Sequence, residues 1–217
     1  MRLGPFTKRK EVILPTWRGW LLLLALAICF FFGILFSVAP FLSPVKPIQA
    51  EVLVMEGWVS ESTIREAIRL NASGSYKLVI STGLVVEKGM DISHYGTYAD
   101  LGVARLKALG FKGTNLVAVR GPNVPKDRTY QSAVALRGYL LTNTPYRTVN
   151  LISDSVHSRR SWYLFEHACR PEIQVGIIAH RNPDFDVRRW WRTSQGVRMV
   201  LNELIAYIYA RVFFDPD

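Results

Sequence analysis

The sequence predicts an α/β protein in which a mostly parallel, five-stranded sheet is covered by helices on both faces and is preceded by one transmembrane helix. Residues 20–38 are almost wholly apolar and predict the transmembrane helix. Beyond residue 49, strand-like and helix-like segments alternate five times, which is typical of a parallel sheet wrapped by helices. The first strand-like run, residues 50–57, is nearly continuously apolar, as expected of a strand buried on both faces.

The amino-terminal apolar segment is long enough to cross a bilayer. No charged side chain occurs in residues 19–45, and the nineteen residues from 20 to 38 would form a helix roughly 28 Å long, about the thickness of the hydrocarbon core. A cleavable signal peptide is the alternative, but Pro40 would then follow the cut. We therefore expect an uncleaved anchor at residues 19–42, in contact with the lipid bilayer.

The residues before this segment are strongly basic. Residues 1–18 hold five basic side chains against one acid, so they contribute +4 to the formal net charge of +10 and leave +6 for the rest. The positive-inside rule keeps such a tail in the cytoplasm. We therefore expect a cytoplasmic tail over residues 1–18 and an extracytoplasmic domain after the anchor. Cys169 is the only thiol of that domain, so an internal disulfide is excluded.

The strands of the domain are predicted from short apolar runs. Residues 43–49, with two prolines, predict a stalk before a domain over residues 50–217. The expected strands cover residues 50–57, 76–82, 115–122, 148–154 and 172–179.

Each strand is followed by a segment with apolar residues at helical spacing. The predicted helices cover residues 60–71, 97–109, 127–141, 156–168 and a final helix that ends near residue 212. Ser60 or Ser62 and Asp127 are the expected amino-terminal caps, and Gly110 is the expected carboxyl-terminal cap. In the final helix one face is shared by Val197, Val200, Leu201, Leu204, Ile205, Ile208 and Val212.

Polar residues occur where the strands end and where the following helices begin. In a parallel sheet these points lie at one edge, where ligands bind, above all where the strand order reverses. The residues concerned are Glu56, Gly57, Thr82, Gly83, Arg128, Thr129, Ser153, Asp154, His157, Arg159 and Arg160. We therefore expect them to share a site at the carboxyl edge of the sheet.

The charged members of this set have two interpretations. Glu56 and Asp154 either orient His157 or only satisfy exposed backbone amides. Arg159 and Arg160 open a helix, where cations oppose the helix dipole. An ordinary solvated face would favour acids at those positions, so the arginine pair indicates an anionic ligand.

Standard cofactor motifs are missing from the sequence. There is no P-loop, no dinucleotide-binding glycine pattern and no nucleophile elbow. The four histidines show no metal-ligand spacing, so we expect no metal and assign no cofactor.

Four stretches resemble the ElyC/SanA/YdcF family of bacterial envelope proteins. "SDSVHSRRSWYLF", residues 153–165, resembles the family's strand end with its His and Arg, and "DRTYQSAVALRGYL", residues 127–140, resembles its Thr-bearing helix. "STG", residues 81–83, is similar to its Ser-Gly-Gly turn, and "YADLGVARLKALGF", residues 98–111, to its helix ending in Leu-x-x-x-Gly.

The resemblance implies a Rossmann-like three-layer fold, a single amino-terminal span in the bacterial plasma (inner) membrane, and a role in envelope or peptidoglycan biogenesis. It implies site roles for Thr82, Gly83, Thr129, Ser153, His157 and Arg160. The chain also departs from the family pattern. Arg128 replaces an Asn, Gln131 replaces a Glu that is a candidate general base, and Arg159 is an additional cation.

Two functions fit these observations. The first is an enzyme acting on a phosphate-bearing carrier or nucleotide-like substrate, with His157 as acid or base. Glu56 or Asp154 would orient the histidine, and phosphate would be held by Arg128, Arg159 and Arg160. The second is a non-catalytic membrane-tethered module that binds such a ligand, or an envelope-synthesis protein. Nucleic acid is not an expected partner of an extracytoplasmic domain without a nucleic-acid-binding motif.

A basic, aromatic segment precedes the final helix. Residues 181–198 hold five arginines around Phe185, Trp190 and Trp191. Such a composition suits the headgroup layer of a membrane. The alternative is that the tryptophans pack under the loop and cover the core. We favour the alternative, because adjacent residues of one short segment seldom both face lipid.

Overall fold

The computed structural model describes residues 12–87, 89–181 and 186–215. The chain divides into two compact units, residues 1–37 and 38–217, and each is described by itself. Most of the predicted basic tail and Phe185 lie outside the described residues.

The predicted transmembrane segment forms a single long helix, α1 (Trp17–Leu42), of 26 residues. Within the described ranges it is the one helix that is long and apolar enough to cross a membrane. Its side chains up to residue 37 are almost all exposed, whereas Ala39 and Leu42 are fully buried in the second unit. The end of the helix is therefore part of the folded domain.

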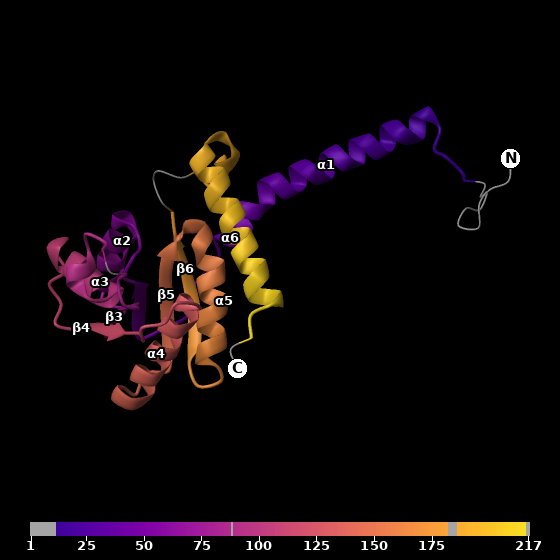
Figure 1. The fold of residues 1–217 in the computed structure, drawn as a ribbon. Coiled ribbons are helices and arrows are strands. Elements are labelled where there is room, and N and C mark those ends of the chain that lie inside the picture. Colours follow the sequence, from indigo (N-terminus) through magenta and orange to yellow (C-terminus); the bar gives the residue numbers. More distant parts are fainter. Residues whose placement is uncertain (1–11, 88, 182–185, 216–217) are drawn as a thin grey trace. The chain divides into compact units, whose positions relative to one another are not determined.

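The second unit is a Rossmann-like α/β domain built on a mixed six-stranded sheet (Figure 1). Five parallel strands correspond to those predicted: β2 (Val52–Glu56), β3 (Leu78–Gly83), β4 (Leu116–Arg120), β5 (Thr148–Asp154) and β6 (Gln174–His180). The sixth, β1 (Val45–Lys46), pairs antiparallel with β6. The order across the sheet is β1-β6-β5-β2-β3-β4.

The prediction of five strands missed β1, which lies in the segment expected to be a stalk. Val45 pairs with Ile178 of β6. The side-chain amide of Asn150 accepts from the Ile48 N–H and donates to the Ile48 carbonyl, each at 2.9 Å. These bonds hold the proline-bearing segment against an edge that would otherwise be unpaired. A two-residue strand has no periodicity that sequence analysis can detect.

Helices cover both faces of the sheet, as predicted. They are α2 (Glu61–Ala72), α3 (Tyr98–Ala108), α4 (Arg128–Asn143), α5 (Ser158–Cys169) and α6 (Ser194–Val212), with short 3-10 turns η1 (Ser93–Tyr95), η2 (Ser155–His157) and η3 (Trp190–Arg192). Alternate residues of β2 enter opposite cores: Leu53 packs with Ile64 and Leu106 of α2 and α3, and Val54 with residues of α4 and α5 such as Phe165.

The helix caps explain where several helices begin and end. The Ser60 hydroxyl accepts from the Thr63 N–H and caps α2, as predicted. Gly110, at φ 98°, follows α3 in the left-handed conformation that glycine adopts without strain. Asp127 precedes α4 at φ 56°, but its side chain makes no capping hydrogen bond, so the predicted capping role is not seen.

Helix α6 presents much of its apolar stripe to the outside. It lies along α5 (Figure 1), and buries Val200 and Ala210. Leu201, Ile205, Ile208 and Val212, by contrast, are exposed. Before α6, Trp190 is only 7% exposed, which agrees with the core-covering interpretation for that tryptophan.

The strand order places a reversal beside β2. The chain moves from β2 outward through β3 to β4, and then returns to the other side of β2 with β5 and β6. The carboxyl ends of β2 and β5 therefore flank the switch point, where α/β folds of this order bind ligands. Glu56 ends β2 and Asp154 ends β5.

Candidate functional site

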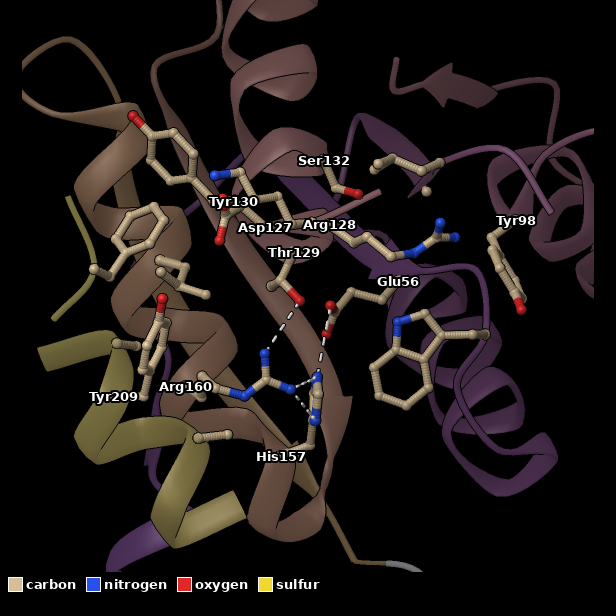
Figure 2. Close-up of a pocket in the computed structure, with 18 of the residues that line it drawn as sticks. Glu56, Tyr98, Asp127, Arg128, Thr129, Tyr130, Ser132, His157, Arg160 and Tyr209 are labelled. Atoms are coloured by element: carbon tan, nitrogen blue, oxygen red, sulfur yellow. Dashed lines mark hydrogen bonds and ion pairs between the residues drawn. The ribbon is translucent and has the colours of Figure 1, made fainter. Parts of the chain in front are cut away.

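A cavity of about 990 Å³ lies at this edge of the sheet (Figure 2). The ends of β2 and β3, the loop before α4, the first turns of α4 and α5, and one side of α6 line it. The structure brings together seven of the predicted site residues there: Glu56, Thr82, Gly83, Arg128, Thr129, His157 and Arg160. The cavity is about the size of a small-molecule site.

Glu56 is a buried carboxylate at the end of β2, with only 2% of its surface exposed. Its Oε2 atom accepts hydrogen bonds from the hydroxyls of Ser153 (2.9 Å) and Ser161 (2.8 Å). A buried carboxylate needs such donors, because its desolvation is otherwise costly. Ser153 therefore stabilises the Glu56 carboxylate through a hydrogen bond, and Ser153 itself does not line the cavity.

His157 is held by an acid that sequence analysis missed. Its Nδ1 atom lies 2.7 Å from Oε1 of Glu203, which projects from α6. Burial alone would raise the pKa of the Glu203 carboxyl, but the hydrogen bonds and charges of His157 and Arg160 outweigh burial and lower this pKa to about 2. An ionised carboxylate only accepts hydrogen bonds, so Nδ1 of His157 carries a proton.

The other ring nitrogen of His157 faces Glu56. Nε2 lies 3.9 Å from Oε1 of Glu56, which is too far for a direct hydrogen bond. In the neutral form of the ring, Nε2 holds the lone pair, because Nδ1 donates to Glu203. The side of the ring that can exchange a proton therefore lies beside the cavity (Figure 2).

Arg160 forms hydrogen bonds within the same cluster. Its Nε donates to Oε2 of Glu203 at 2.9 Å, and one terminal nitrogen lies 3.4 Å from the Thr129 hydroxyl. Figure 2 shows its guanidinium between Thr129 and His157. Since Glu203 already neutralises Arg160, this arginine positions the histidine–glutamate pair more than it supplies an unpaired charge.

Two other cations of the cavity form no ion pair with any carboxylate of the described residues. Arg128 donates to the Val85 carbonyl at 2.9 Å, and its guanidinium lies 5.8 Å from the centre of the Tyr98 ring. Lys126 lines the rim. In the described part of the chain, no carboxylate lies within ion-pair distance of either side chain. These two residues are therefore the cations best placed to meet an anion.

The walls beside the histidine are aromatic on one side and apolar on the other. The Trp58 ring stands edge-on to the His157 ring, with centroids 4.4 Å apart. The opposite wall comes from α5, α6 and the residue beyond α6's end: Leu164, Ile205, Ala206, Tyr209, Ala210 and Phe214. The cavity thus has a polar end at the sheet and an apolar side at α6.

Asp154 and Gly57 do not reach the cavity. Asp154 accepts from the Ser60 N–H (2.8 Å) and from the Ser60 and Thr63 hydroxyls. It therefore ties β5 to the start of α2, and it does not orient the histidine. A Cβ atom on Gly57 would lie 1.8 Å from the Tyr98 carbonyl oxygen, so Gly57 allows α3 to pack closely on the sheet.

Arg159 was expected to bind the ligand, but it lies elsewhere. Its Nε donates to the Phe41 carbonyl, and its guanidinium lies 3.9 Å from the centre of the Phe41 ring. Adjacent helical residues point about 100° apart, so Arg159 and Arg160 at the start of α5 cannot both face the cavity. The structure therefore places only Arg160 of the two arginines at the cavity.

A sequence signal for Glu203 did exist. It is the only acidic residue of α6, a helix otherwise rich in apolar residues. A lone acid on such a helix needs a partner, but the sequence does not reveal that His157 is that partner, because 46 residues separate them.

No metal site accompanies this cluster within the described ranges, where no three acids, histidines or cysteines are grouped to hold an ion. Comparisons of the chain with protein-family models, with curated proteins and with solved structures find no match.

Proposed function

We propose that this protein is a membrane-anchored enzyme of the bacterial cell envelope that performs acid–base chemistry on a phosphate-bearing carrier lipid. The sequence resemblance to the ElyC/SanA/YdcF family supports membership of that family and a role in envelope biogenesis. The basic tail before α1 supports an inner-membrane location with the α/β domain outside the cytoplasm.

One observation carries the enzymatic part of the proposal. The Nδ1 atom of His157 is hydrogen-bonded to a carboxylate of lowered pKa, while Nε2 faces Glu56 beside a cavity of about 990 Å³. A carboxylate that accepts from one ring nitrogen fixes the tautomer and strengthens the other nitrogen as a base.

The arrangement suits cleavage of a phosphate ester. Nε2 of His157 takes a proton from water as the water oxygen bonds to phosphorus. The imidazolium, stabilised by Glu203 and Glu56, then returns the proton to the ester oxygen as the P–O bond breaks. Arg128 and Lys126 would meet the charge of the phosphate.

The apolar side of the cavity favours a lipid over a nucleotide. A phosphate group at His157 and Arg128 would leave the rest of the ligand beside Ile205, Tyr209 and Phe214. Ile205 and Phe214 offer no hydrogen bond to a ribose and base, and together with the ring of Tyr209 they suit a hydrocarbon chain.

The ligand class can be tested with the full-length protein in detergent. We expect farnesyl phosphate to raise Tm, by binding the native state, more than farnesol, inorganic phosphate or uridine monophosphate does. An equal effect of farnesol would show that the phosphate is not recognised. An effect of uridine monophosphate alone would favour a nucleotide-like ligand.

Catalysis is tested by phosphate release from the bound ester. His157→Gln should lower the rate by roughly 10²–10⁴-fold, the usual contribution of a general acid–base residue. His167→Gln, an exposed histidine of α5, should leave the rate unchanged. A native protein that binds the ester and releases no phosphate would instead be the non-catalytic binding module.

A further inference from the structure

An apolar stripe on α6 faces outward along much of the helix. Leu201, Ile205, Ile208 and Val212 are 45%, 66%, 48% and 66% exposed, and their spacing of four, three and four residues places them on one face. Phe213, 69% exposed, extends the stripe beyond the helix end. In a soluble domain, a helix ordinarily packs such a stripe against the core. An exposed apolar stripe therefore indicates a surface that binds a partner.

A contact between the end of α1 and α6 indicates which surface lies near the stripe. Phe41 lies in the last turn of α1, one residue before the helix ends at Leu42. Its ring lies 5.7 Å from the ring of Tyr207 in α6, and both residues belong to the second unit. If α1 crosses a bilayer, α6 is therefore held beside the point where the chain leaves it.

Two arginines lie near Phe41 and α6 in this part of the domain. Arg159 lies against Phe41, and Arg211 near the end of α6 lies 4.9 Å from the centre of the Tyr163 ring. Basic side chains at an anionic membrane surface stabilise the attachment of a nearby apolar helix face.

We propose that α6 is a membrane-surface helix, whose stripe of Leu201, Ile205, Ile208 and Val212 sits in the interface of the same bilayer that α1 spans. Helices of this kind bury their apolar face about 5–10 Å into the boundary between headgroups and acyl chains. The partner of the stripe is thus lipid. Because the anchor holds the domain at the membrane, α6 is always close to lipid.

The stripe also continues into the cavity. Ile205 and Tyr209 are both exposed and both line the cavity wall. An amphiphile could pass along this wall from the bilayer to His157 without leaving an apolar surface. This consequence rests on the proposed function, whereas the membrane contact of α6 does not.

Depth measurements on the full-length protein test the contact. A nitroxide is attached to Ile208→Cys after Cys29→Ala, and the protein is reconstituted in vesicles of phosphatidylglycerol and phosphatidylethanolamine. Cys169 can stay, because burial raises the pKa of its thiol to about 12 and keeps it unreactive. Val134→Cys on α4, 39% exposed, is the matched control.

We expect the label at position 208 to collide more with dissolved oxygen than with a water-soluble nickel chelate, and the label at position 134 to show the reverse. Labels at Ile205→Cys and Val212→Cys, both at exposed positions, should repeat the result. Equal nickel accessibility at 208 and 134 would overturn the proposal. So would a short spin–spin distance between copies at position 208, because a second chain would then cover the stripe.

Discussion

At the scale of single residues, the centre of the site is a cluster of four side chains whose charges depend on one another. Glu203 accepts from both His157 and Arg160, and Glu56 faces the other side of the imidazole. Only 18% of the Glu203 side chain is exposed, so its interactions are screened less than those of a surface pair.

Removing the charge of Glu203 should therefore destabilise the fold. Glu203→Gln leaves Arg160 without its carboxylate, and we expect a loss of roughly 3 kcal/mol in the free energy of unfolding, measured with urea. The matched control is Glu166→Gln, which removes a pair with Arg170 at the surface and should cost less than about 1 kcal/mol. Equal losses in the two variants would mean that the cluster adds no stability.

The same carboxyl should make stability depend on pH. Its pKa is about 2 in the folded protein against an ordinary value of 4.5. The stabilisation is thus fully present above pH 4.5, and it is lost as pH falls from 4.5 toward 2. We expect the stability difference between the native protein and Glu203→Gln to shrink over this range by on the order of 3 kcal/mol. A difference that stays constant down to pH 3 would contradict the lowered pKa.

At the scale of elements, close contact between β2, β3 and α3 positions the cavity wall. A Cβ on Gly57 would lie 1.8 Å from the Tyr98 carbonyl oxygen, and one on Gly102 would lie 2.8 Å from the Cα of Gly57. Because the obstructing atoms include backbone, the helix can only move away from the sheet. Tyr98, which lines the cavity, would move with it.

Two alanine substitutions distinguish this packing from general effects of glycine. Gly57→Ala should lower the free energy of unfolding by about 1–3 kcal/mol or more, because it overpacks the contact. Gly138→Ala, within α4 with nothing within 4 Å of the new Cβ, should raise it by about 0.5–1 kcal/mol through helix propensity. Thermal or urea unfolding of both variants measures the difference. A neutral Gly57→Ala would mean that α3 is not held as tightly as this contact indicates.

At the scale of the whole molecule, the basic tail, the apolar helix and the domain follow one another in the order expected of a protein anchored with its amino terminus inside. A reporter that works only outside the cytoplasm, such as a secreted phosphatase fused after Asp217, should be active. A fluorescent protein that folds only in the cytoplasm should give no signal at the same position. The reverse result would exclude both the orientation and the proposed envelope role.

The sequence by itself determined the features that depend on local pattern. The continuous apolar runs of α1 and of the five parallel strands, and the helical spacing of apolar residues in the helices, are all patterns within short stretches of the chain. Burial on all sides favours a continuous apolar run, and burial of one face imposes a period. The strand ends and the starts of the following helices also indicated seven residues of the cavity, among them Glu56, Thr129 and His157, because parallel strands place their carboxyl ends at one edge.

Only the tertiary structure decided which of those residues act together. Glu203 is hydrogen-bonded to His157 although 46 positions of the sequence separate them. Arg159 contacts Phe41, from which 118 positions separate it, and it therefore lies outside the site. Strand β1 pairs with β6 although its two residues have no pattern of their own. Each of these contacts joins segments far apart in the chain, and their meeting depends on how the helices pack over the sheet. Local periodicity specifies which face of an element is buried, but it does not specify which distant side chain that face meets.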